Sequence, residues 1–249
     1  MTYPLFFGEP AAVRSARVGS VFVLGGDEGR HATTVRRLAP GERVDVADGA
    51  GFRLRGTVTD GSAGTLAVRV ESAEQEQAPR QQLVLIQALA KGDRDEQAIE
   101  AATELGVDAV VPWQAERSIV RWRAEKAVKG QRKWEAVVAG AAKQSRRAWV
   151  PEVHPMLDSA RLPAWSARFD RVFVLSETAG EGLARLAAGP SQGGTTAVIV
   201  GPEGGISERE LLALQEAGAA AARLGPHVLR SSSAGPAALV LLNHVLGRW

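Results

Sequence analysis

Residues 195–218, TTAVIVGPEGGISERELLALQEAG, contain the pattern that decides the fold of this chain. The apolar run before Gly201 has the length of a buried strand, and Gly201–Gly205 then turns the chain into a helix. Ser207 and Glu210 have the spacing of a capping box at the start of that helix. Open α/β sheets bind ligands beyond the carboxyl ends of their strands, and glycines let a ligand approach the backbone. The turn is therefore either a ligand site or a plain strand-to-helix connection.

Strands and helices alternate on both sides of this segment. LVLIQAL (83–89) and RVFVLSE (171–177) are continuous apolar runs that predict buried strands, and 107–113 predicts a further one. Residues 93–106, 124–145 and 234–249 predict helices. This alternation indicates a mostly parallel sheet covered by helices, which is an α/β domain.

The N-terminal part of the chain has a different pattern. Short apolar runs at 21–24, 44–47 and 54–59 are separated by glycine-containing turns, which is typical of strands. A polar stretch with Pro79 follows them. We expect a β-rich domain over 1–74, a linker over 75–81 and the α/β domain over 82–249.

The composition narrows the class of protein. The 249 residues are 45% hydrophobic and 23% charged, as in ordinary globular proteins, and no apolar run approaches the length of a membrane helix. The start of the chain lacks the pattern of a secretory signal, so we expect the cytoplasm. With no cysteine, disulfides, cysteine-ligated metals and a thiolate nucleophile are excluded. The four histidines have no metal-ligand spacing, so no metal is expected.

Basic residues gather between Arg117 and Arg147. This stretch holds ten lysines and arginines against two glutamates, a net charge of +8, with Trp122 and Trp134 among them. Clustered cations favour a phosphate backbone, and aromatic rings can stack on unpaired bases. The alternative is a solvated helical face.

A second candidate loop precedes the last helix. LGPHVLRSSSAG (224–235) places Arg230 beside an apolar loop, where a cation commonly meets an anion or a polar ligand edge. One of Ser231, Ser232 and Ser233 is expected to cap the helix. The sequence lacks the glycine and lysine spacing of a P-loop, and it has no G-x-G-x-x-G motif after the first strand of the α/β domain. It therefore gives no support to an ATPase or an NAD-binding enzyme.

In their order along the chain, these segments resemble the RsmE-type family of 16S ribosomal RNA uridine-N3 methyltransferases, within the SPOUT superfamily. HATTVRRLAPGERVDVADGAG (31–51) is similar to the PUA-like RNA-binding segment of the family, and KGDRDEQAIEAATELGVDAVVPWQAERS (91–118) to the start of its catalytic domain. KWEAVVAGAAKQSRRAWVPEV (133–153), VGPEGGISERE (200–210) and LGPHVLRSSSAG follow.

The resemblance implies a deep trefoil knot in the C-terminal domain, a homodimer, and S-adenosylmethionine as cofactor. The implied partner is 16S rRNA in the small ribosomal subunit. Carried over residue by residue, the cofactor-binding positions are Leu175, Ser176, Glu177, Gly201, Glu203, Gly204, Gly205, Ile206, Leu224, Gly225, Val228, Leu229 and Arg230. The chain departs from the family pattern at His227, at Ser231–Ser233 and at Lys143.

The implied reaction requires N3 of a uridine to lose its proton, and a guanidinium beside the flanking carbonyl oxygens would favour the resulting anion. Arg230 is the first candidate for this role and Arg117 the second. Glu203 is a candidate proton acceptor, or alternatively a structural acceptor of backbone N–H groups. Candidate RNA-binding residues are Arg30, His31, Arg36, Arg37, Lys91, Arg94, Arg146 and Arg147.

Three alternatives stay open at this point. Another SPOUT enzyme would methylate a ribose 2′-hydroxyl or guanine N1, and the modified nucleoside would distinguish it. A noncatalytic RNA-binding protein of ribosome assembly would fail to bind the cofactor. A nucleotide-dependent metabolic enzyme lacks the loops it would need.

Overall fold

The structure is a computed structural model that describes residues 3–62, 64–189 and 193–249. The chain divides into two compact units: an N-terminal unit of Met1–Ala78 with Ala142–Val150, and a C-terminal unit of Pro79–Ala141 with Pro151–Trp249. The first unit therefore includes Ala142–Val150, a segment that we expected in the larger domain. The last strand of the first sheet ends at Gln75 and the first strand of the second sheet begins at Gln81, so the connection between the two sheets spans 76–80.

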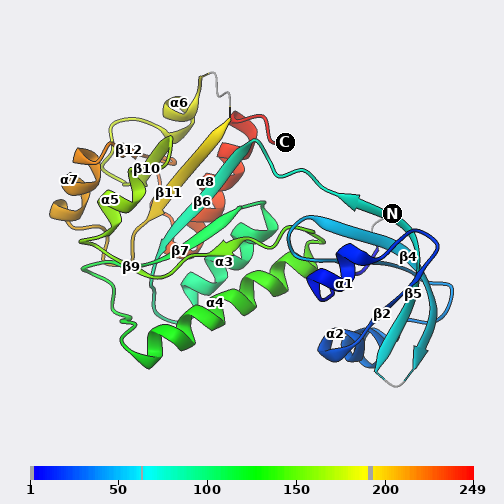
Figure 1. Cartoon of the computed structure of the whole chain (residues 1–249). Helices are drawn as coiled ribbons and strands as arrows, with labels where there is room; N and C mark the ends of the chain where they lie inside the picture. Colours follow the sequence, from blue (N-terminus) through cyan, green and yellow to red (C-terminus); the bar gives the residue numbers. More distant parts are fainter. Residues whose placement is uncertain (1–2, 63, 190–192) are drawn as a thin grey trace. The chain divides into compact units, whose positions relative to one another are not determined.

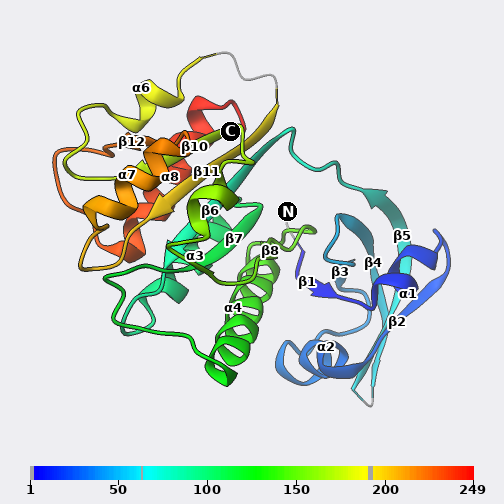
Figure 2. The same ribbon diagram turned by 60° about the vertical axis from the view of Figure 1, so that its left-hand side comes forward.

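The N-terminal unit is built on a five-stranded sheet of order β1-β3-β4-β5-β2 (Figure 2). β1 pairs with β3 in parallel and the other neighbours are antiparallel. On β5, Leu66, Val68 and Val70 are buried and alternate with outward residues, as the period of a half-buried strand requires. The elements are β1 (Leu5–Phe7), α1 (Pro10–Ser15), β2 (Val21–Leu24), α2 (Gly26–Arg30), the π-helix η1 (His31–Val35), β3 (Arg43–Ala47), β4 (Phe52–Ser62) and β5 (Thr65–Gln75).

Close contacts attach Ala142–Val150 to this sheet. The indole of Trp149 lies so near Gly51, which has a φ of +89°, that any added Cβ would overlap the ring. Trp149 Nε1 also donates to the carbonyl of Glu76 at 3.2 Å. Arg53 donates to the carbonyl of Arg146 at 2.8 Å. These contacts join residues far apart in sequence, which explains why local pattern placed the segment elsewhere.

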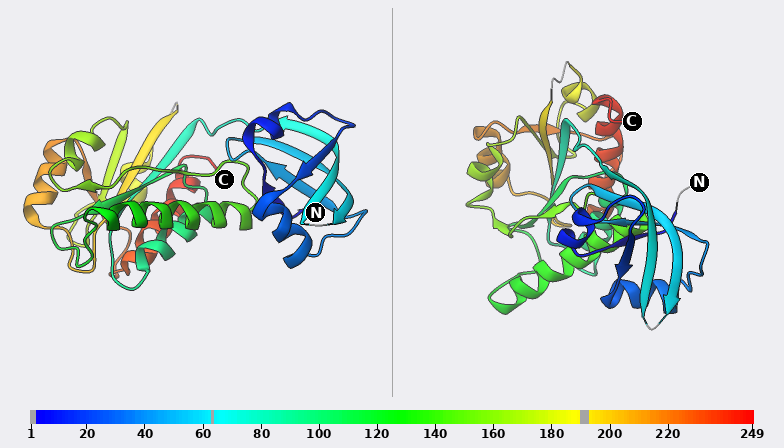
Figure 3. Two further views of the ribbon diagram at one scale, coloured as in Figure 1. Left: turned by 60° about the horizontal axis from the view of Figure 1, so that its bottom comes forward. Right: turned by 45° about the vertical axis from the view of Figure 1, so that its right-hand side comes forward.

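The C-terminal unit has a parallel sheet of order β12-β10-β11-β6-β7-β8, with β9 paired to β7 (Figure 1). Figure 3 shows α4 as one continuous helix. The strands are β6 (Gln81–Ala88), β7 (Ala109–Gln114), β8 (Glu152–Val153), β9 (Leu157–Asp158), β10 (Arg171–Leu175), β11 (Gly194–Val200) and β12 (Ala220–Ala222). The helices are α3 (Arg94–Glu104), α4 (Glu125–Gln144), α5 (Leu162–Ser166), α6 (Leu183–Ala187), α7 (Glu208–Glu216) and α8 (Ser231–Val245).

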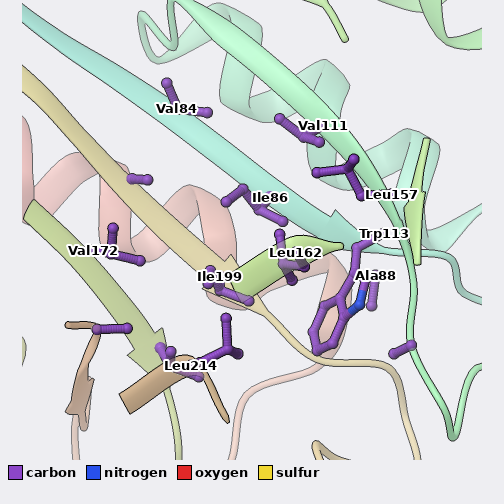
Figure 4. Packing of buried hydrophobic residues seen from close by; sticks show 14 of the residues in the cluster. Val84, Ile86, Ala88, Val111, Trp113, Leu157, Leu162, Val172, Ile199 and Leu214 are labelled. Atoms are coloured by element: carbon purple, nitrogen blue, oxygen red, sulfur yellow. The ribbon is translucent and has the colours of Figure 1, made fainter. Parts of the chain in front are cut away.

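Both faces of this sheet are covered, as the continuous apolar strands predicted. Ile86 and Ile199 share a core with Leu162 of α5 and Leu214 of α7 (Figure 4). Leu85 points to the opposite face, where a Cβ on Gly235 of α8 would lie 2.9 Å from its Cδ1. The predicted α/β class with a small β-rich N-terminal part is confirmed.

Two further expectations concern the helices. The capping box of α7 is confirmed: Ser207 Oγ accepts from Glu210 N at 3.1 Å, and Glu210 Oε2 accepts from Ser207 N at 2.9 Å. The predicted serine cap of α8 is wrong, because its N-cap is Arg230, whose side chain makes no capping bond, and Ser231–Ser233 form the first turn. No helix in the described part of the chain combines the length and apolarity of a membrane span.

Candidate functional site

Three loops of the C-terminal unit meet at one edge of the sheet. They follow β10, β11 and β12, which are parallel strands in the order β12-β10-β11. Because the carboxyl ends of such strands lie at one edge, the sheet brings together 175–177, 201–206 and 224–230. Ser176 N donates to Ala222 O at 3.0 Å, which joins two of these strand ends directly.

The loop after β11 is a tight glycine turn. Gly205 N donates to Pro202 O at 2.9 Å, and Gly205 has a φ of +72°, a conformation that favours glycine. A Cβ on Gly201 would lie 2.7 Å from Ile206 Cγ1, so a side chain there would displace the turn. Glu203, Gly204 and Gly205 are exposed and present their backbone to solvent.

Arg117 contacts this turn from the segment between β7 and α4. Its Nη1 donates to Gly204 O at 3.1 Å, and a Cβ on Gly204 would lie 3.1 Å from Arg117 Cβ. The missing side chain at Gly204 thus makes room for the arginine. The structure therefore brings two sequence-predicted residues together, across a separation of 87 positions.

The buried carboxylate of Glu210 holds the segment that carries Arg117. Glu210 Oε1 accepts from the backbone N–H of Glu116 at 2.7 Å and from the hydroxyl of Ser159. Glu116 also forms an ion pair with Arg209, and the hydrogen bond from Arg209 holds the pKa of Glu116 below its ordinary value. The capping box spacing identified Glu210, but gave no sign of these contacts with distant residues.

Glu203 is held by the loop before α3. Its Oε1 accepts from the backbone N–H of Lys91 at 3.1 Å and from Arg94 Nη1 at 3.0 Å. Partial burial opposes ionisation, but the backbone hydrogen bonds and Arg94 outweigh it, so the pKa of Glu203 lies below its ordinary value. Lys91 and Arg94 thus lie beside the glycine turn, and their role in RNA binding stays a prediction.

The loop 224–230 presents free backbone and apolar side chains. The N–H groups of Gly225, His227, Val228 and Leu229 make no hydrogen bond to any residue that the structure describes, and Val228 is 76% exposed. Arg230 is exposed and forms no ion pair within the described ranges. Ser231 is buried and accepts from Gln87 Nε2 at 2.8 Å, so it anchors the start of α8 to β6.

Known proteins that resemble this chain are RNA methyltransferases. A family model described as an RNA methyltransferase domain matches residues 76–243, and one described as an RNA methyltransferase PUA domain matches 24–71. The "Ribosomal RNA small subunit methyltransferase E" of Mycobacterium bovis is 44% identical over 93% of this chain and 89% of its own. The chain belongs to the ribosomal RNA small subunit methyltransferase E family.

Solved structures of methyltransferases have the same fold. The methyltransferase E of Neisseria gonorrhoeae, bound to S-adenosyl methionine, matches with a TM-score of 0.82 at 27% identity and covers 98% of both chains. A Legionella pneumophila methyltransferase in complex with the same cofactor matches with a TM-score of 0.84 at 25% identity, again over 98% of both chains.

The remaining candidate RNA-binding residues of this methyltransferase E family member lie in its N-terminal unit. Arg30 pairs with Asp27 and is exposed; Arg36 and Arg37 are exposed after η1. His31 packs edge-on against Phe6. Arg146 and Arg147 follow α4, and Arg146 has a φ of +61°. Their role in RNA binding stays a prediction.

Lys143, which we expected to depart from the family pattern, has a structural partner. Its Nζ donates to Glu28 Oε1 at 2.8 Å and lies 3.4 Å from His31 Nδ1. An ammonium group has no acceptor, so His31 Nδ1 accepts in this contact. Lys143 thus belongs to an ion pair of the N-terminal unit. In the described residues, no group of three or more acidic or histidine side chains could hold a metal ion.

Proposed function

We propose that this chain methylates N3 of a uridine in 16S ribosomal RNA and uses S-adenosylmethionine as the methyl donor. The observation that carries the proposal is the arginine at the glycine turn: Arg117 bonded to Gly204 at the joint edge of β10, β11 and β12. Membership of the methyltransferase E family and the cofactor in the Neisseria relative support it.

The residues at this edge fit the cofactor. The unbonded N–H groups of 225–229 can bind polar edges, and exposed Val228 and Leu229 can cover an apolar ring. Gly225 leaves open space, since a Cβ there would meet nothing within 4 Å. Together with 175–177 and 201–206, these residues would hold S-adenosylmethionine, which supplies a methyl group on a sulfonium when bound.

The protein's part is to orient the uridine and to stabilise the anion left when N3 loses its proton. We propose that Arg230, which is exposed and unpaired among the described residues, faces the carbonyl oxygens of the base. Arg117, fixed on the turn, supports it. Glu203 is already ion-paired, and we assign it to holding the turn against Lys91 and Arg94 rather than to accepting the proton.

We further propose that the active form is a homodimer in the cytoplasm, with the 224–230 loop part of a trefoil knot. Val228 and Val240 support the dimer: they are 76% and 42% exposed, on the loop and on α8, so a second copy could cover both. Sedimentation equilibrium tests this, and a monomer at all concentrations would contradict it.

The decisive experiment is transfer from labelled S-adenosylmethionine to small ribosomal subunits from cells lacking this protein, followed by nucleoside mass spectrometry. Label in 3-methyluridine is the expected result. Label in a 2′-O-methylated nucleoside or in 1-methylguanosine would overturn the target and keep the reaction class. No label together with no cofactor binding would favour a noncatalytic RNA-binding protein.

A further inference from the structure

A cavity of the N-terminal unit is lined by described residues of that unit alone. Its volume is about 1000 Å³, and its lining includes Tyr3, residues of β3, β4 and β5, and the segment after α4. A ligand site commonly has a volume of about 300 to 1,000 Å³. None of its strand residues was singled out in the sequence, because strand alternation alone does not distinguish a hollow face from a flat one.

The lining is rich in cations, with four arginines against two carboxylates. Two of the arginines are committed to the fold. Arg53 is buried between Asp45 at 2.7 Å and Glu76 at 2.6 Å, and Arg43 pairs with Glu71. The other two are available: Arg55 is 45% exposed and 3.7 Å from Glu74, and the side chain of Arg146 has no ion pair among the described residues.

Arg146 lies at this wall in a left-handed backbone conformation. Its φ of +61° is uncommon for a residue with a side chain, and its carbonyl accepts the bond from Arg53. This conformation ends α4: Arg147 N donates to Ala142 O at 2.9 Å and Arg146 N to Lys143 O at 3.1 Å, as at helix ends with a left-handed residue. The buried Arg53 therefore places the neighbouring cation rather than binding a ligand itself.

Two further features indicate what kind of ligand fits. The Cζ of Arg43 lies over the ring of Tyr3, 5.0 Å from the ring centroid, so a planar cation packs against an aromatic ring. Asp45, which lines the cavity and is 5% exposed, has an Oδ1 with no hydrogen-bond partner in the ranges that the structure describes. The cavity thus offers a stacking surface, one loosely paired and one unpaired cation, and an acceptor without a partner among the described residues.

We propose that this cavity binds one unpaired nucleotide of the RNA strand. Arg55 and Arg146 meet its phosphate, the base stacks on the Tyr3–Arg43 pair, and an N–H of the base donates to Asp45 Oδ1. The proposal rests on the proposed function in that RNA is the substrate. It adds a second point of attachment, in the unit that does not hold the cofactor.

The test is a fluorescence titration of the full chain with a short labelled oligouridylate and with a blunt RNA duplex of the same length. Arg55→Gln combined with Arg146→Gln removes the two charges that would meet the phosphate, and glutamine at 146 must adopt the same backbone conformation as arginine. Ser72→Trp fills the cavity at a lining residue without changing charge. Arg69→Gln is the matched control, since it removes an exposed charge from β5 outside the lining.

We expect the wild type to prefer the single strand, and both lining variants to bind it about tenfold more weakly or worse. The control should stay within about twofold, with unchanged melting temperatures throughout. Wild-type affinity in both lining variants would overturn the proposal. If the arginine double variant bound the single strand more weakly but Ser72→Trp bound it normally, the proposal would also be overturned. The cations would then attract RNA to the protein surface without the cavity holding a nucleotide.

Methyl transfer on the same preparations separates this proposal from the proposed function. If the wild type forms 3-methyluridine while the lining variants bind and methylate normally, only the cavity proposal fails. If the wild type forms none, the proposed function fails, and the titration still decides whether the cavity binds a nucleotide.

Discussion

Arg53 donates a hydrogen bond to the backbone carbonyl of Arg146, 93 positions later in the chain, at 2.8 Å. The same guanidinium pairs with Asp45 and Glu76, and the Arg53 side chain is 9% exposed. One side chain therefore joins β4, β3, the end of the small sheet and the segment after α4.

Replacing Arg53 with methionine should destabilise the protein severely. The change leaves the Asp45 carboxylate buried without its partner, which costs about 3 to 5 kcal/mol. Urea unfolding followed by circular dichroism measures the loss. Arg55→Met is the control: its ion pair is loose and half-exposed, so it should cost about 1 kcal/mol or less. Equal losses would contradict this account of Arg53.

Gly51 and Gly41 form a matched pair of glycine substitutions. Both have a positive φ, of +89° and +93°, so alanine strains the backbone at either position. Only at Gly51 would the new methyl group also overlap the ring of Trp149, whereas Gly41 has nothing within 4 Å. We expect thermal unfolding to show a cost of about 1 kcal/mol for Gly41→Ala and about 3 kcal/mol for Gly51→Ala. Similar costs would mean that Trp149 moves freely.

Asp95 should make stability depend on pH. Burial raises the pKa of this carboxyl to about 6, against hydrogen bonds from backbone N–H groups that include that of Glu96. The folded protein thus favours the protonated form, so the stabilisation from this group is present below the ordinary pKa and is lost as pH rises through about 6. Relative to wild type, Asp95→Asn should gain about 2 kcal/mol in free energy of unfolding between pH 4 and pH 7. Parallel stability curves would contradict this.

Glu203→Gln tests whether this carboxylate acts as a general base or only holds the glycine turn in place. The amide keeps an acceptor for Lys91 N–H but loses the charge that pairs with Arg94, a partly exposed pair. We expect less than a tenfold loss of methyl transfer and an unchanged pH profile, where loss of a general base would cost about 100-fold or more. Arg94→Gln should produce a similar loss, and the double variant little more. A 100-fold loss confined to Glu203→Gln would make it the base.

Arg230→Ala should separate binding from reaction. Because the side chain has no partner among the described residues, its removal leaves the loop intact, so cofactor affinity measured by calorimetry should hardly change. Transfer to the subunit should fall about 100-fold or more if the guanidinium stabilises the uridine anion. Arg185→Ala, an exposed arginine on α6, is the control. Wild-type turnover by Arg230→Ala would remove Arg230 from the mechanism.

The sequence predicted correctly those features that depend on residues close to one another along the chain. The capping box of α7 depends on Ser207 and Glu210, three residues apart, and it formed as predicted. The predicted serine cap of α8 did not form: Ser231 lies in the first turn, and its hydroxyl accepts a hydrogen bond from Gln87, 144 positions away.

For the candidate site, the sequence predicted individual residues but not the contacts between them. The glycine turn and Arg117 could each be named, but their contact required the order of strands in the sheet. The pairing of Lys143 with Glu28, 115 positions apart, gave no sequence signal, and neither did the hollow face of β3, β4 and β5.

The assignment of Ala142–Val150 to the N-terminal unit also bears on how such a protein can be rearranged in evolution. A module that occupies one stretch of chain can be exchanged between genes by a single recombination at its boundary. Here the two units are joined at three places, after Ala78, Ala141 and Val150. A gene fragment ending at residue 78 would lack Trp149 and the backbone that Arg53 binds. We therefore expect the two units to be inherited together.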